Sequence, residues 1–450
     1  MRCLSVLLFV FSLLFLNPGT ALCEVRALLV ACREFLSAPS LGYDSSANLQ
    51  TLAACLNLSG VKGEHILLED GTISSPSILS EAAQQAFSGA DENDLCLLYL
   101  CTHGFPDPYL LLSDGQSEEP LTPRELHALL SPLPGKKMLI LDACSSGAFL
   151  ESSDSPLINA PSITVLTSCG AEERSWYSAG KHLSTGTLSY FVHAFCAGLG
   201  LYGHPEADAD ENGEISPTEL LLHLMDTCVL STPRVSQAFA SSPALPVVHS
   251  PLPERALTDF SFGPQLLSPD NPEILLSCTV RRDTAIQYRL VEYQNGEWNW
   301  PDSSLISGGV AKAGRLSKTL SLQGTEAGDY YALQVYAMEK GYAALCASRL
   351  FAIHAPFPNS YSSSYSYEQM PSGTLQIHLA SPALITCKLV TPTGKIQSVL
   401  CQSHLFLPSR DGYVTLYPDI SNFSNEANKN MLWWVAIDQG DGKTISLKSN

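Results

Sequence analysis

The sequence predicts an α/β domain with a doubly wound, mostly parallel sheet and flanking helices, followed by two all-β sandwich modules. From residue 25 to about residue 250, short apolar runs alternate with helical patterns, as in a parallel sheet covered on both faces. After Pro251 the chain changes to short alternating strands with frequent turns, which indicates antiparallel sheets. The length of 450 residues, 45% of them hydrophobic, is enough for about three domains with sizeable cores.

The first 23 residues are predicted to be a signal peptide. Met1-Arg2 is a short positive start, Leu4–Leu16 is apolar, and a helix-breaking Asn-Pro-Gly follows. The apolar run is too short to span a bilayer, and cleavage is expected after Ala21 or Cys23. Lipidation of Cys23 would require a small residue at the preceding position, and the Leu22 found there disfavours it. We therefore expect an exported protein (periplasm, cell surface or secreted) without a membrane-spanning segment.

The α/β domain is expected over residues 24–250. Its strands are nearly continuous apolar runs, which is typical of central parallel strands. They are predicted at Val25–Ala31, Glu64–Leu68, Asp94–Cys101, Lys136–Leu141 and Ser162–Ser168. Helices are predicted around Asn48–Leu56, at Ile78–Phe87, from a capping box at Thr122 and Glu125, and over Thr187–Leu199. Reactive groups in such a domain lie at the carboxyl ends of the strands.

The remaining residues are expected to form two β-sandwich modules, 251–356 and 357–450, the second including a Ser-, Tyr- and Pro-rich linker. Each module has the size of an immunoglobulin-like or fibronectin III-like sandwich. Strands are predicted at Ile274–Arg281, Ile286–Tyr293, Tyr330–Ala337, Thr374–Leu379, Ile385–Val390, Tyr413–Tyr417 and Leu432–Ile437, and Asn295-Gly296 is a hairpin signal.

The formal net charge is −19, and the acidity is concentrated in the first half of the chain. Residues 24–250 contain 27 acidic and 9 basic side chains. This balance argues against a general binder of nucleic acid or of anionic membranes, which would present a basic face. An acidic body favours cationic partners, although acidity also serves solubility alone.

Two predicted strand ends carry candidate catalytic residues. One strand is followed by Thr102-His103-Gly104 and the next by Asp142-Ala143-Cys144. If these strands are neighbours, His103 and Cys144 lie at the same sheet edge, where an imidazole can promote thiolate attack. Gly104 allows close approach of the main chain, and its N–H together with that of Cys144 could form an oxyanion hole. Taken singly, a buried Cys or His is more often a packing residue; the combination favours catalysis.

This layout resembles the caspase-like cysteine peptidases, the clan of caspases, metacaspases, legumain and clostripain. The most specific match is the Leu139–Gly147 segment, which is similar to the metacaspase Asp-x-Cys-His-Ser-Gly motif. The other matching features are the His-Gly after a strand, the Leu112-Ser-Asp-Gly115 turn, the helix start at Leu121–Leu126 and the Thr187–Phe195 helix. It covers residues 24 to 250. It implies hydrolysis of peptide bonds with Cys144 as nucleophile and His103 as general acid/base.

The resemblance also implies a substrate pocket. Asp142 matches the metacaspase acid that pairs with an Arg or Lys in P1, the substrate residue before the scissile bond. Legumain has an acid at the same place and cleaves after Asn, so both P1 preferences stay open, with the basic one favoured. Metacaspases have a second acid in this pocket, and it would align with Asp44 or, in another register, with Asn48. Arg33 offers a third alternative, a pocket for an acidic P1 residue.

The segment Asp208–Glu219 fits the twelve-residue EF-hand loop. Asp208, Asp210, Asn212 and Glu219 would supply side-chain oxygens to calcium, and Glu214 would supply a backbone carbonyl. Gly203 and Pro205 break the helix that normally enters such a loop. The alternative is an acidic turn in which Ser216 caps a helix at Pro217–Thr227. No other cofactor is expected.

Together these features predict an exported cysteine endopeptidase that acts on proteins or peptides. Two rival functions are a catalytically silent caspase-like scaffold that binds peptides and a surface adhesion protein in which the sandwiches bind the partner.

Overall fold

The computed structural model describes residues 23–41, 45–177, 188–236, 238–239, 242–249, 255–294, 297–299, 305–339, 342–354, 365–369, 375–379, 381–391, 396–407, 413–416, 432–438 and 444–448. The predicted signal peptide up to Leu22, Asp44 and the Asn295-Gly296 turn lie outside these residues. In the described part of the chain, no helix is long and apolar enough to cross a membrane.

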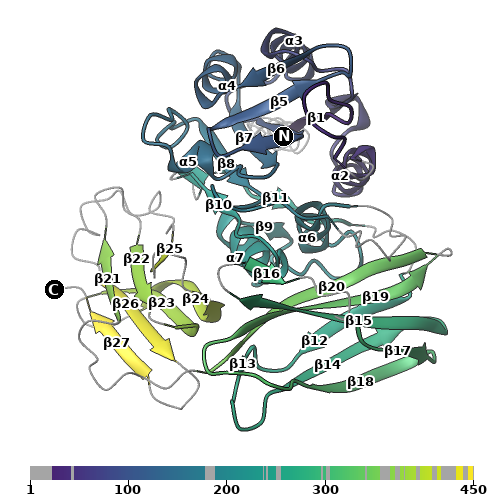
Figure 1. Ribbon diagram of the computed structural model, residues 1–450. Coiled ribbons are helices and arrows are strands. Elements are labelled where there is room, and N and C mark those ends of the chain that lie inside the picture. Colours follow the sequence, from purple (N-terminus) through teal and green to yellow (C-terminus); the bar gives the residue numbers. More distant parts are fainter. Residues whose placement is uncertain are drawn as a thin grey trace, which may run out of the picture.

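A six-stranded sheet organises the N-terminal domain (Figure 1). Its order is β10 (Arg234–Val235), β8 (Ile163–Thr167), β7 (Lys136–Asp142), β3 (Leu95–Cys101), β1 (Val25–Ala31) and β2 (Ile66–Asp70). All neighbours are parallel except β10, which runs antiparallel to β8. The prediction of an α/β domain with a mostly parallel sheet is confirmed.

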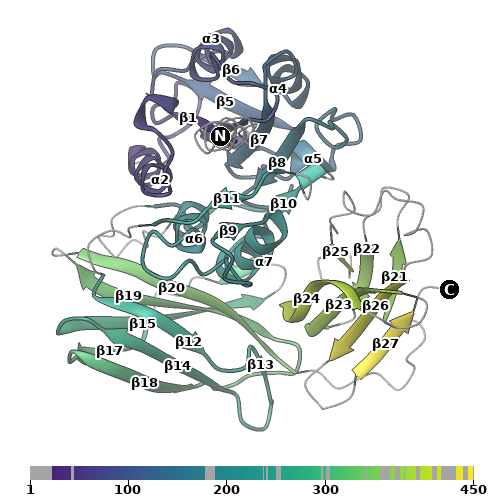
Figure 2. The same cartoon turned by 180° about the vertical axis from the view of Figure 1, so that it is seen from behind.

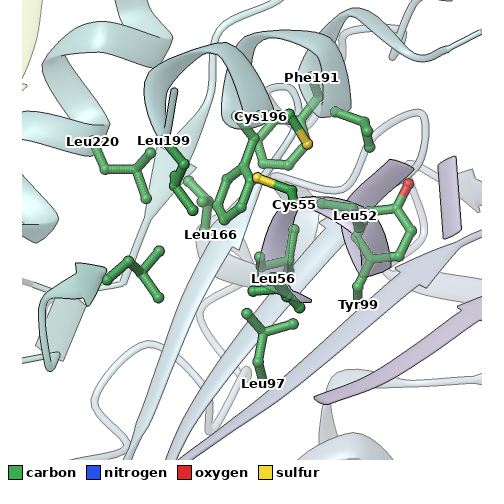
Figure 3. Close-up of a cluster of buried hydrophobic side chains, with 14 of the residues drawn as sticks. Leu52, Cys55, Leu56, Leu97, Tyr99, Leu166, Phe191, Cys196, Leu199 and Leu220 are labelled. Atoms are coloured by element: carbon green, nitrogen blue, oxygen red, sulfur yellow. The ribbon is translucent and has the colours of Figure 1, made fainter. Parts of the chain in front are cut away.

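Helices cover both faces of this sheet. A first core joins the sheet to α2 (Ser46–Leu58), α6 (Tyr190–Gly198) and α7 (Pro217–Thr227). Figure 3 shows part of this core, with Cys55 and Leu56 facing Phe191 and Cys196 above the strand residue Leu97. A second core lies on the opposite face, against α3 (Pro76–Ala86), α4 (Pro123–Leu130) and α5 (Ala148–Glu151).

The boundaries of the predicted elements differ from the structure where polar turns intervene. Residues Gly63–His65 form a 3-10 turn (η1), so β2 begins two residues later than expected. Helix α6 begins at Tyr190, because Ser189 caps it by accepting the N–H of Val192. The capping box at Thr122 and Glu125 is present as predicted.

A small antiparallel sheet follows β3 directly and was not predicted from the sequence. It consists of β4 (His103–Phe105), β5 (Tyr109–Ser113) and β6 (Glu118–Leu121). This sheet carries His103, so the candidate residue two positions after β3 belongs to a strand and not to a loop. A two-stranded ladder of β9 (Glu214–Ile215) and β11 (Leu245–Pro246) lies near α7.

Residues 255–354, here called the first β unit, contain two mainly antiparallel sheets around one core. One sheet consists of β12 (Leu257–Phe262), β14 (Glu273–Val280) and β18 (Gly314–Ser321). The other consists of β13 (Leu266–Leu267), β20 (Tyr342–Ile353), β19 (Tyr330–Glu339), β15 (Thr284–Gln294), β16 (Glu297–Asn299) and β17 (Leu305–Ala311).

The second β unit, residues 365–448, again has two sheets around a core. They are β21 (Tyr365–Gln369) with β22 (Leu375–Leu379) and β25 (Tyr413–Leu416), and β24 (Ile396–Phe406) with β23 (Ala383–Val390), β26 (Leu432–Asp438) and β27 (Thr444–Lys448). The predicted β-rich C-terminal half is confirmed, while the immunoglobulin-like assignment stays a prediction.

The three parts of the chain meet at helix α7. Asp226 near its end forms an ion pair with Arg349 of β20 at 3.3 Å, and its other carboxylate oxygen lies 3.4 Å from Nε2 of His404 on β24. Figure 2 shows α6 and α7 lying between the α/β sheet and strands β19 and β20. The described cysteines are free thiols, and Cys387 lies directly opposite Cys401 on β23 and β24.

Candidate active site

The ends of β3 and β7 bring His103 and Cys144 to the same edge of the sheet. The register places Cys101 opposite Asp142, and each candidate residue follows two positions later. The main chain of Gly104 lies against Cys144, since a Cβ at Gly104 would be 2.1 Å from the Cys144 carbonyl oxygen. Only glycine allows this approach, and His103 and Cys144 therefore lie on adjacent main-chain segments.

The imidazole of His103 is oriented by a backbone carbonyl. Its Nε2 lies 2.8 Å from the carbonyl oxygen of Pro39, and its ring packs on Phe35 with centroids 4.6 Å apart. A carbonyl oxygen only accepts hydrogen bonds, so in the neutral imidazole Nε2 carries the hydrogen and Nδ1 has the lone pair. Sequence reasoning missed Pro39, which lies 64 residues from His103 and has no local signal of this contact.

A sharp turn after β7 holds the half-buried Cys144. Ser145 adopts a left-handed conformation with φ of 54° and donates its N–H to the Glu173 carbonyl at 2.8 Å. At Gly147, a Cβ would meet the main chain of Gly170 at 2.6 Å. The glycine of the Cys-Ser-Ser-Gly motif thus lets the segment after β8 pass close to the turn.

The surroundings of the Cys144 thiol disfavour its ionisation. Burial raises the pKa of Cys144, while the main chain of Ser175 and the nearby Arg174 act in the opposite direction. The Sγ atom lies 3.9 Å from the Ser175 carbonyl oxygen. Burial therefore favours the neutral thiol in this conformation, and attack on a carbonyl would require a base.

Asp142 lies directly before the turn and is buried, at 3% exposure. Oδ1 accepts the Ser175 hydroxyl at 2.8 Å, while Oδ2 accepts the hydroxyls of Tyr99 at 2.8 Å and Ser189 at 2.5 Å. Burial raises the pKa of Asp142, and the hydroxyl donors oppose that shift. Within the described residues, no cationic side chain forms an ion pair with it.

The structure connects Asn48, the alternative to Asp44, to the same network. Its Nδ2 donates to the Tyr99 hydroxyl at 3.0 Å, and its Oδ1 accepts the Ser189 N–H at 3.0 Å. Asp44 lies outside the described residues. Arg33 pairs with Asp70 at 3.1 Å, so its charge already has a partner on β2.

The predicted EF-hand segment forms a tight acidic turn before α7. Carboxylate oxygens of Asp208, Asp210 and Glu219 lie within 4.8 Å of one another. Asp208 accepts the backbone N–H groups of Asn212 and Gly213, each at 3.0 Å. Glu219 also completes a capping box with Ser216 at the start of α7, and Glu214 pairs with Pro246 in the β9–β11 ladder. The turn therefore suits both a helix cap and an oxygen-ligand site, and calcium stays a prediction.

Comparison with known proteins identifies the N-terminal domain. Residues 25–226 match the family model of the caspase domain. Among solved structures, the crystal structure of Caspase-1 from Spodoptera frugiperda matches with 15% sequence identity and a TM-score of 0.32, covering 45% of this chain and 75% of that one. No curated protein matches the sequence. Residues 25–226 thus belong to the caspase-like family of cysteine peptidase domains.

Proposed function

We propose that this protein is an exported cysteine endopeptidase that cleaves after basic residues, with Cys144 as nucleophile and His103 as general acid/base. The observation that carries the proposal is the adjacency of these residues inside a caspase domain, with Gly104 against the Cys144 carbonyl. The export prediction rests on the apolar segment near the N-terminus. The two β units are proposed to be immunoglobulin-like modules.

In the first half of the reaction, His103 takes the Cys144 proton through Nδ1 as sulfur attacks the substrate carbonyl carbon. A C–S bond forms, and the resulting oxyanion is placed near the N–H groups of Gly104 and Cys144. The C–N bond then breaks, and His103 returns the proton to the leaving amine. Pro39 keeps the imidazole in the required tautomer through its contact with Nε2.

In the second half, water replaces the amine. His103 removes a proton from this water as its oxygen attacks the thioester carbon. The C–S bond breaks, the sulfur regains a proton from His103, and the carboxylic acid product leaves. Every step uses only water and residues already at the site.

The preference for a basic P1 residue is proposed from Asp142. Its carboxylate is buried, is held in place by hydroxyl donors, and has no cationic partner among the described residues. A P1 guanidinium or ammonium group could supply that partner. Arg33, the alternative for an acidic P1 residue, is engaged by Asp70.

The test is cleavage of a peptide library by the purified full chain. We expect cleavage after Arg or Lys that is lost in Cys144→Ala and in His103→Ala. Two matched controls should retain activity: Cys96→Ala, a buried thiol at the other end of β3, and His127→Ala on α4. Binding of peptides without cleavage by the wild type would favour the scaffold function instead.

A further inference from the structure

The first β unit packs against the catalytic domain through a surface that is buried like a protein core. On β19, Leu333 and Val335 face the unit's own core, whereas Ala332 and Tyr336 belong to a second cluster with Tyr190 of α6. Both faces of this strand are therefore buried. Figures 1 and 2 both show α6 between this sheet and the α/β sheet.

Buried polar groups are paired across the same contact. The hydroxyls of Tyr190 and Tyr336 lie 3.1 Å apart, and both side chains are fully buried. The ring Nε2 of His193 contacts the Leu345 carbonyl oxygen at 3.0 Å, and Arg255 donates to the same oxygen at 2.6 Å. Paired buried polar groups fix one relative placement of two surfaces, because displacement would leave them unsatisfied.

Two residues in this contact are direct sequence neighbours of residues that touch the candidate active site. Ser175 and Ser189 donate their hydroxyls to Asp142, and the Ser175 carbonyl lies beside Cys144. Their immediate neighbours point the other way. Trp176 packs against the cluster that contains Tyr190 and Tyr336, and the Tyr190 N–H donates to the Trp176 carbonyl at 2.9 Å.

We propose that the first β unit is a positioning element of the active site, with Tyr336 as its central positioning residue. By holding Trp176 and Tyr190, it holds Ser175 and Ser189 against the Asp142 carboxylate. The consequence for substrates rests on the proposed function, since Asp142 would then bind the basic P1 residue. The coupling itself is a property of the fold and can be measured without substrate.

The test compares two substitutions on one strand of the full-length protein. Tyr336→Ala removes the side chain that faces α6, whereas Leu333→Ala removes one that faces only the unit's own core. Hydrogen–deuterium exchange should show faster exchange of the Ser189 and Tyr190 amides in Tyr336→Ala alone. Tyr336→Phe keeps the ring but loses the hydroxyl that contacts Tyr190, so its amide exchange should lie between that of the wild type and that of Tyr336→Ala.

Kinetics on a P1-Arg peptide supply the second readout. In Tyr336→Ala, we expect kcat/KM to fall by about ten- to a hundredfold, because a displacement of about 1 Å at a site can cost a hundredfold. Most of this loss should appear as a rise in KM. A variant that is merely less stable would contain fewer active molecules, so its apparent kcat would fall while KM stayed unchanged. For Leu333→Ala we expect no effect larger than this.

If Tyr336→Ala does not fold, Leu350→Ala, a smaller deletion in the same cluster, replaces it with the same expectations. Unchanged amide exchange at residues 188–190 and unchanged KM in the folded variant would overturn the proposal. If the wild type cleaves no peptide, the exchange result still decides the coupling, so failure of the peptidase function is distinguished from failure of this inference.

Discussion

The substitution Asp142→Asn tests whether a buried carboxylate recognises a basic P1 residue. Asn has nearly the same size, removes the charge and replaces one acceptor oxygen with an NH2 donor. A desolvated ion pair of the kind a P1 guanidinium would form with Asp142, a side chain 3% exposed, gives on the order of 2–4 kcal/mol. We therefore expect kcat/KM for a P1-Arg peptide to fall by about 30- to 1000-fold, at a factor of ten per 1.36 kcal/mol.

Stability provides the internal control for this variant. Burial raises the pKa of Asp142 above its unfolded value, so the folded state binds this proton more tightly than the unfolded state does. The contribution of Asp142 to stability is then fully present below the unfolded pKa and is lost as pH rises through the folded pKa. The substituted amide has no such proton, so the Tm of the wild type should fall relative to that of Asp142→Asn as pH rises.

The assay measures kcat/KM on peptides that differ only in having Arg or Asn at P1. Asp94→Asn is the matched control, since Asp94 is also buried but precedes β3 at the opposite sheet edge. An unchanged ratio between the two peptides in Asp142→Asn would refute a role for this carboxylate in P1 recognition. A strong preference of the wild type for Asn would refute the basic P1 assignment itself.

Three further outcomes follow from the site. Gly104→Ala should lower the free energy of unfolding by about 1–3 kcal/mol, because its Cβ would overpack against the Cys144 carbonyl. The same variant should not cleave peptides, and an unchanged Tm in thermal unfolding would contradict the close approach. Since burial raises the pKa of Cys144, its alkylation by iodoacetamide should accelerate with pH from 6 to 9, with Cys144→Ala as the blank; a rate independent of pH would indicate a preformed thiolate. Millimolar calcium should raise Tm relative to EDTA if the Asp208–Glu219 turn binds it, and Glu219→Gln should remove the shift; no shift in the wild type leaves the turn as a helix cap.

The sequence predicted those parts of the fold that have a local signal. The strand at Val25–Ala31 has the predicted bounds, and β3, β7 and β8 differ from the prediction by a residue or two, because buried parallel strands are continuous apolar runs. The helix at Pro217–Thr227 also agrees, since Ser216 and Glu219 form a capping box that is visible in four residues.

Contacts between distant residues had no such signal. The hydrogen bond between Asn48 and Tyr99 spans 51 residues, and that between Tyr190 and Tyr336 spans 146. Each partner alone reads as an ordinary polar or aromatic residue, so the network around Asp142 could not be inferred. The small sheet β4–β5–β6 was missed for a related reason: its strands are three to five residues long, too short for a period to show.

The most direct test of the central claim is covalent capture of the nucleophile. A peptide acyloxymethyl ketone with Arg at P1 should label the wild type once, and mass spectrometry should place the adduct on Cys144. We expect no label in Cys144→Ala and much slower labelling in His103→Ala, with Cys96→Ala behaving as the wild type. An adduct on another residue, or labelling that survives in Cys144→Ala, would contradict the assignment of Cys144 as the nucleophile.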